Sequence, residues 1–158
     1  MGTHEPIREG EFEKCAQMYQ DSIANDPSSI WLAVRDYVSG KIVGGCNWKL
    51  YVNAAEKGTD RETKRPSWLE GEDLEFSNMI CGDSSQARRE AMPGPHAYLH
   101  ICFTDAAYRR RGAGSMMLQW GVDVADLLHI PAYIEAYGHV AIAPEDQVLT
   151  AWAQVQGR

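Results

Sequence analysis

Residues 97–120 read AYLHICFTDAAYRRRGAGSMMLQW, and this stretch decides the fold of the 158-residue chain. Apolar, β-branched and aromatic residues dominate 96–104, which predicts a strand. A short basic connection follows, and Gly112 and Gly114 then open a segment rich in Met, Leu and Trp that predicts a helix over 112–129. Pro131 restarts the chain as a second predicted strand, 132–136. Strand, helix and strand form a βαβ unit, so we expect these two strands to lie parallel with a right-handed crossover.

The basic turn between strand and helix has the properties of a phosphate site. Backbone N–H groups at a helix start have no partner within the helix, and the helix dipole favours an anion there. Glycine lets a ligand approach the backbone closely because it has no Cβ. Arg109, Arg110 and Arg111 stand in an otherwise acidic chain and supply donors suited to phosphate. The turn therefore predicts an anion-binding site rather than an ordinary solvated loop.

At these residues the chain resembles the GNAT (GCN5-related) N-acetyltransferase family, with wording closest to fungal-type members. The family's acetyl-CoA motif, Arg or Gln, two residues, Gly, one residue, then Gly or Ala, is matched by Arg109 to Gly114. The resemblance implies acetyl-CoA as co-substrate. Its pantetheine arm would pair with the backbone of Cys102, Phe103 and Thr104, so we expect this strand to separate from the strand that starts at Ala132. Its pyrophosphate would lie on backbone N–H groups of Arg110, Arg111, Gly112, Ala113, Gly114 and Ser115, with charge added by Arg109 and Arg111.

The rest of the chain up to Ala136 fits a mixed, mostly antiparallel α/β sheet flanked by helices. An apolar stripe predicts a helix over 11–25, and an antiparallel hairpin is predicted from strands 30–36 and 42–52. Gly44 and Gly45 indicate a bulge or a close contact. Segment 68–92 allows one helix, or two broken near Gly82, which serve either as packing helices or as a lid at the substrate entrance. In the helix 112–129 we expect a buried stripe of Met117, Trp120, Val124, Leu127 and Leu128.

The resemblance stops after Ala136. A helix is predicted over 145–156, and the family's closing strands are expected to be absent or replaced. An uncovered strand would expose backbone groups and apolar surface, so we expect a homodimer or the tail itself to cover it. Because the missing segment often carries the family's general acid, we expect slow or absent turnover.

Composition limits the remaining possibilities. The length predicts a single domain over 1–158. A net charge of −7 argues against a nucleic-acid or membrane-surface partner, which would need a basic face. The four cysteines show no metal-binding spacing, so no metal is expected. There is no signal-like segment and no run of about 18 apolar residues, which favours a cytoplasmic protein.

The catalytic residues are less well determined than the cofactor turn. His100 lies on the predicted central strand, shares strand parity with Tyr98, and has an ordinary pKa of about 6.5 that suits proton transfer. A hydrogen-bonded core histidine is the alternative. Glu135 ends the next strand and either faces the cofactor or is simply solvated.

Three functions remain to be compared. The first is acetyl transfer to a primary amine of a small molecule, peptide or protein. The second is a CoA-binding module with impaired or no catalysis and a regulatory role. The third, a nucleotide-binding domain, is disfavoured because no Gly-Lys-Ser/Thr follows the glycines. The sequence does not name the acceptor.

Overall fold

The computed structural model describes residues 10–53, 68–137 and 150–155, and it contains a single sheet with helices on both faces. The elements run α1 (Glu11–Asn25), β1 (Ser29–Arg35), β2 (Ile42–Tyr51), α2 (Gly71–Ala91), β3 (His96–Thr104), the short 3₁₀ helix η2 (Ala106–Tyr108), α3 (Ala113–Leu128), β4 (Ala132–Tyr137) and β5 (Thr150–Val155). The bounds of β3, α3 and β4 agree with the predicted strand–turn–helix–strand unit to within a few residues. The mixed α/β class is confirmed.

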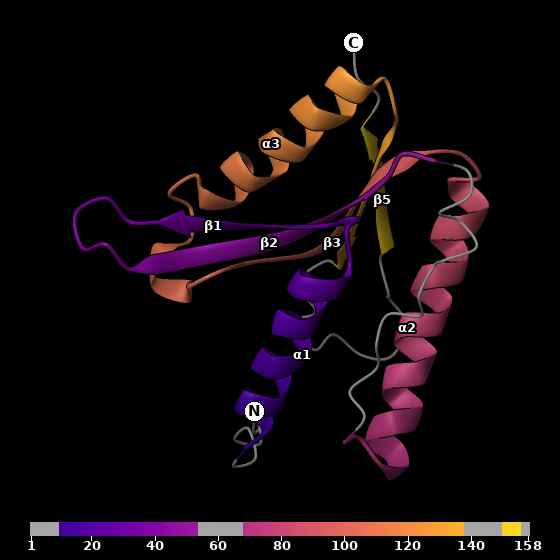
Figure 1. Ribbon diagram of the computed structural model, residues 1–158, viewed down its shortest axis with the longest axis horizontal. Coiled ribbons are helices and arrows are strands. Elements are labelled where there is room, and N and C mark those ends of the chain that lie inside the picture. The colour runs from indigo at the N-terminus through magenta and orange to yellow at the C-terminus, as the bar shows by residue number, and fades with distance from the viewer. Residues whose placement is uncertain (1–9, 54–67, 138–149, 156–158) are drawn as a thin grey trace.

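The five strands of the described part stand in the order β1-β2-β3-β4-β5. Only β3 and β4 are parallel, while the other neighbouring strands pair antiparallel. Figure 1 shows α3 on one side of the sheet and α1 and α2 on the other. The sheet therefore has two covered faces, and the basic turn lies where β3 leads into α3.

For residues 68–92 the sequence allowed one helix or two, and the alternative of two helices is wrong. α2 is one continuous helix through Gly82, with Glu72 and Asp73 in its first turn and Arg88 and Arg89 in its last. These charges match the helix dipole at each end and help a single helix persist.

The predicted C-terminal helix is wrong where the structure describes it. Residues Thr150–Val155 form β5, which pairs antiparallel with β4 from Tyr137↔Thr150 to Ala132↔Val155. Residues 138–149 lie outside the described part of the chain. β5 occupies the edge of β4 that would otherwise leave backbone groups unpaired, which is the physical reason for a strand here. One closing strand is thus present, and the argument for a homodimer from an open β4 edge no longer applies.

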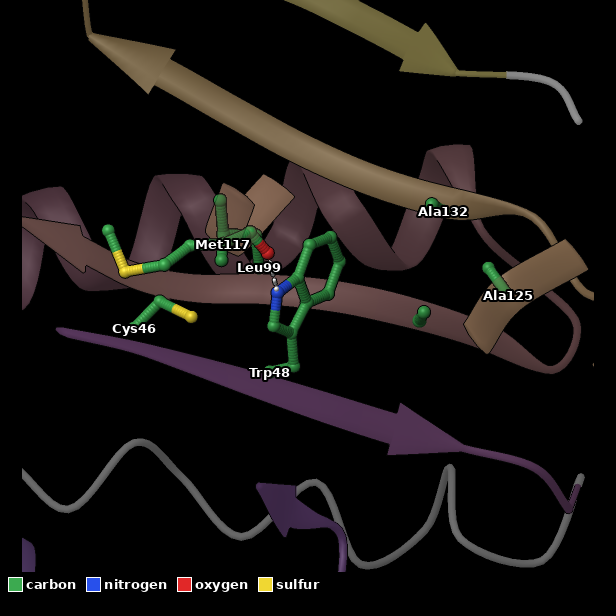
Figure 2. Packing of buried hydrophobic residues seen from close by; sticks show 7 residues of the cluster. Cys46, Trp48, Leu99, Met117, Ala125 and Ala132 are labelled. Carbon is green, nitrogen blue, oxygen red and sulfur yellow. Dashed lines mark hydrogen bonds between the residues drawn. The ribbon is translucent and has the colours of Figure 1, made fainter. Parts of the chain in front are cut away.

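The core lies between the sheet and α3. Cys46 and Trp48 of β2 and Ala97 and Leu99 of β3 meet α3 in one buried cluster. Figure 2 shows the indole of Trp48 rising from β2 toward the helix, where its Nε1 donates a hydrogen bond of 3.0 Å to the carbonyl oxygen of Met117. The bond satisfies the indole N–H of a side chain that is fully buried.

The buried face of α3 matches the predicted stripe in part, because Met117 is buried and Trp120 packs, partly buried, against the core cluster. Its fully buried residues repeat every four positions: Ala113, Met117, Gly121 and Ala125. Leu127 is 79% exposed and Leu128 is 42% exposed. The helix is turned this way because Gly121 must face Trp48, and large residues at neighbouring positions are rotated outward.

Candidate functional site

The basic turn is built from residues with unusual backbone conformations. Arg110 has φ 59° and Gly112 has φ 88°, both in the left-handed region. A side chain in that region costs about 1–2 kcal/mol, so the strain at Arg110 is a feature that the surroundings must hold in place. Such conformations turn neighbouring N–H groups toward a common side, an arrangement that binds anions.

The start of α3 is open and carries no competing negative charge. Gly112 is the N-cap residue and offers no side-chain cap, and the first turn of α3 contains no acidic residue. An added Cβ at Gly112 or Gly114 would meet no atom within 4 Å. The glycines therefore do not serve internal packing, and the space above them is available to an anion at a positive helix end.

A small network fixes the turn from the side of the β1–β2 hairpin. Lys41 Nζ lies 2.7 Å from Asp105 Oδ2, and Asp105 Oδ1 also accepts a hydrogen bond of 2.9 Å from the N–H of Ala107. Lys41 Nζ lies 5.3 Å and Arg111 Cζ 5.0 Å from the ring centroid of Tyr108. The hydrogen bond from Lys41, with that from Ala107, lowers the pKa of Asp105, so the carboxylate stays ionised. Sequence reasoning missed Lys41, because only the folded hairpin brings it to this turn.

Beyond the middle of the sheet, β3 and β4 separate as predicted. Their parallel pairing covers only Ala97↔Ala132, Tyr98↔Tyr133 and Leu99↔Ile134. β3 continues to Thr104, which remains paired with Gly44 of β2 on its other side. Cys102, Phe103 and Thr104 therefore lie beyond the β3–β4 ladder, where an added extended chain could pair with the backbone of β3.

His100 lies at the point where the strands part. Asn47 pairs with Ile101 and Trp48 with Leu99, so His100 is the extra residue of a β-bulge. Its ring lies 5.8 Å from that of Tyr98, which confirms that the two side chains share a face of the sheet. That face is opposite to α3, because the neighbouring Leu99 belongs to the core cluster.

The surroundings of His100 favour its neutral form. Burial, with the positive charges of Lys49 and Arg88, lowers the pKa of His100 to about 4, against an opposing effect of Asp26. Lys49 is itself paired with Asp26. At neutral pH the imidazole is therefore uncharged and can accept a hydrogen bond, but it holds a proton more weakly than a general base working near pH 7.

Glu135 is less informative. It lies in β4, opposite Trp152 of β5 and one residue beyond the last β3–β4 pair. Its side chain lies outside what the structure describes, so its catalytic role stays a prediction. In the described part of the chain, no group of three His, Cys, Asp or Glu side chains is placed to hold a metal ion. No helix in that part is long and apolar enough to cross a membrane.

This geometry agrees with comparison to protein families. The model of the acetyltransferase (GNAT) family matches residues 3–143. The chain belongs to the GNAT family. This GNAT protein is therefore related to acetyltransferases, and its basic turn falls inside the matched region.

A solved structure shows the same fold. This GNAT chain is similar to a crystal structure described as histone acetyltransferase HPA2 and related acetyltransferase from Corynebacterium glutamicum, with 19% identity, a TM-score of 0.54, and coverage of 94% of this chain and 76% of that one. NAA60 from Arabidopsis thaliana in complex with acetyl-CoA matches at 17% identity and a TM-score of 0.43, covering 86% of this chain and 75% of that one. No curated protein gives a significant sequence match.

Proposed function

We propose that this GNAT protein transfers the acetyl group of acetyl-CoA to a primary amine of a small molecule or peptide. The observation that carries the proposal is the end of the β3–β4 ladder at Leu99, followed along β3 by the arginine turn and the open start of α3. Along β3 the chain thus has backbone groups that are not paired with β4, followed by an anion site. The pantetheine arm and the pyrophosphate follow one another in the same order in CoA.

The residues present fit that co-substrate. The backbone of Cys102, Phe103 and Thr104 would hold the extended arm, as an added strand is held. The N–H groups of the turn from Arg110 to Ser115 would hold the pyrophosphate, with charge from Arg109 and Arg111. Because Lys41 and Asp105 fix this turn from the hairpin, the site would be largely formed before the ligand binds.

When bound, acetyl-CoA supplies an activated acyl carbon: the amine nitrogen bonds to it, the C–S bond breaks, and the amine proton ends on the CoA sulfur. The chain's part is to place a neutral amine beside that carbon. His100 lies at the bulge where the ladder ends, and its uncharged imidazole would accept a hydrogen bond from the amine. We propose this positioning role for His100, with Glu135 as a second candidate for taking the proton.

One observation favours the alternative of a CoA-binding module with impaired catalysis. The pKa of His100 at about 4 makes it a weak proton acceptor. A protein with an intact cofactor turn and no better base would bind acetyl-CoA well and turn over slowly. Both proposals describe a single-domain, cytoplasmic protein that works without nucleic acid, a membrane or a metal ion, as a monomer or a homodimer.

One variant at the start of α3 and one control elsewhere test the cofactor site. Gly114→Val should fold, because an added Cβ at this helical position meets nothing within 4 Å, yet it should lower acetyl-CoA affinity at least tenfold by blocking backbone approach. Gly94→Val, at a second glycine with open space and ordinary φ, is the matched control. Calorimetry would give the affinities. Equal acetyl-CoA affinity in wild type and Gly114→Val would reject this placement.

A thiol-release assay over a panel of primary amines then separates the two functions. Release that depends on both acetyl-CoA and an amine supports the transferase. Tight acetyl-CoA binding without amine-dependent release supports the binding module. Light scattering on the same samples reports whether the protein self-associates.

A further inference from the structure

α2 meets the sheet through a charged side chain. Among the residues of α2 whose side chains the structure describes, Arg88 is the buried one, at 5% exposure, and Met79 on the same helix is 56% exposed. The helix then ends at the buried Met92. Arg88 therefore anchors the last turns of α2 among buried and half-buried residues of the strands.

The surroundings of Arg88 form a cation site. Its Cζ lies 4.7 Å from the ring centroid of Tyr98 and 5.3 Å from that of Tyr51. Its Nη1 lies 3.1 Å from Nε2 of His96, whose Nδ1 is 2.8 Å from the carbonyl oxygen of Gly94. A carbonyl only accepts and a guanidinium only donates, so Nδ1 carries the proton and Nε2 is an acceptor. Two aromatic rings and a ring nitrogen thus face one positive group.

This site lies beside the point where acyl transfer would take place. Tyr98 pairs with Tyr133 in the β3–β4 ladder, one pair before it ends, and their ring centroids are 5.9 Å apart. The ring centroid of His100 lies 5.8 Å from that of Tyr98. The guanidinium of Arg88 is therefore one aromatic ring away from the bulge at which the proposed function places the acyl carbon and the amine.

We propose that Tyr51, Tyr98 and His96, here called the aromatic cage, form a subsite for a positively charged group of the acceptor, and that Arg88 occupies it until the acceptor binds. The inference rests on the proposed function and names its substrate class. The acceptor carries two basic groups: one amine reacts in its neutral form, while a second ammonium or guanidinium replaces Arg88 in the aromatic cage. The rings offer such a group a desolvated cation–π contact. The C-terminal part of α2, which connects directly to β3 (Figure 1), withdraws as the acceptor enters.

The test uses agmatine, which has a primary amine and a guanidinium, and n-butylamine, which has the amine alone. Calorimetry at one neutral pH compares wild type with Arg88→Ala and with Arg88→Met, which keeps an apolar stem over the rings. Both variants should bind agmatine at least about tenfold more tightly than wild type, because neither places a cationic side chain in the aromatic cage to compete with the acceptor. The affinity for n-butylamine should not change. Arg89→Ala, at the exposed neighbouring position, is the matched control and should behave as wild type.

A second substitution shows whether any gain comes from the rings. Tyr98→Leu in the Arg88→Ala background should abolish the gain in agmatine affinity. The inference is overturned if folded Arg88 variants bind agmatine no better than wild type, or if the gain survives Tyr98→Leu. It is also overturned if circular dichroism shows that both Arg88 variants fail to fold, because Arg88 would then be an anchor required by the fold.

Acetyl-CoA binding separates this inference from the proposed function. If wild type and all variants bind acetyl-CoA and only the gain for agmatine is missing, the aromatic cage is not an acceptor subsite and the transferase proposal stands. If wild type does not bind acetyl-CoA, the proposed function fails first, and a gain for agmatine in the variants would still report a cation site.

Discussion

The indole of Trp48 fills the space where Gly121 would otherwise carry a side chain. A Cβ added to Gly121 would lie 2.0 Å from Cε2 of Trp48, well inside contact distance. The Nε1 of the same ring donates a hydrogen bond to the carbonyl oxygen of Met117, one turn earlier in α3. Trp48 and Gly121 therefore set how closely α3 approaches β2 and which face of α3 is buried, and through α3 they place the anion turn at its start.

Gly121→Ala should destabilise the protein. The methyl group cannot fit beside Trp48 without moving α3 or the ring, and overpacking of a core costs about 1–3 kcal/mol, which outweighs the gain of about 1 kcal/mol in helix propensity. Urea unfolding would measure the difference. Gly114→Ala in the same helix is the control, because its Cβ enters open space and its stability should be equal or higher. A Gly121→Ala protein as stable as wild type would contradict this packing.

Cys102 should report occupancy of the strand that the co-substrate would extend. The thiol of Cys102 is exposed, while Cys46, directly opposite on β2, is buried and burial raises its pKa to about 11. Burial also raises the pKa of Cys102, but alkylation followed by mass spectrometry should still modify the exposed Cys102 before Cys46, which should react only on unfolding. Acetyl-CoA should slow modification of Cys102 at least fivefold. Unchanged labelling at saturating acetyl-CoA would exclude the arm from this part of β3.

His100 should make the protein less stable in mild acid. Its pKa is about 4 in the folded state and about 6.5 when unfolded, so the unfolded chain binds the extra proton first as the pH falls. Stability should therefore drop from pH 6.5 toward pH 4, by at most about 3 kcal/mol. In His100→Gln this part of the pH dependence should be absent. Equal slopes of unfolding free energy against pH in the two proteins would show that His100 is not perturbed.

Lys41 should strengthen co-substrate binding without supporting the fold. It is an exposed residue whose ion pair with Asp105 is on the surface, so its contribution to stability is small. Lys41→Met should leave the unfolding free energy within about 0.5 kcal/mol of wild type. It should weaken acetyl-CoA binding severalfold, because Asp105 and Tyr108 lose a contact that orients the turn. Lys41→Arg should restore most of the affinity, and Lys14→Met on α1 should have no effect on binding.

The sequence by itself determined the central unit of this protein. The strand 96–104, the basic turn and the helix after it were predictable because their signals are local: β-branched and aromatic residues, glycines at a helix start, and a proline that restarts the chain. The separation of β3 from β4 and the shared face of Tyr98 and His100 were also predicted correctly. These follow from the family's pattern and from strand parity, which a short stretch of sequence retains.

Tertiary structure alone decided the rest. The buried face of α3 is set by Trp48, more than sixty positions earlier in the chain, so periodicity within the helix selected Leu127 and Leu128 incorrectly. Thr150–Val155 forms a strand because its backbone pairs with N–H and C=O groups at the edge of β4 that would otherwise be unpaired. Lys41 reached the anion turn and Arg88 reached the aromatic cage only through contacts between distant elements. Local patterns fix backbone conformation, whereas burial and pairing depend on which surfaces the folded chain brings together.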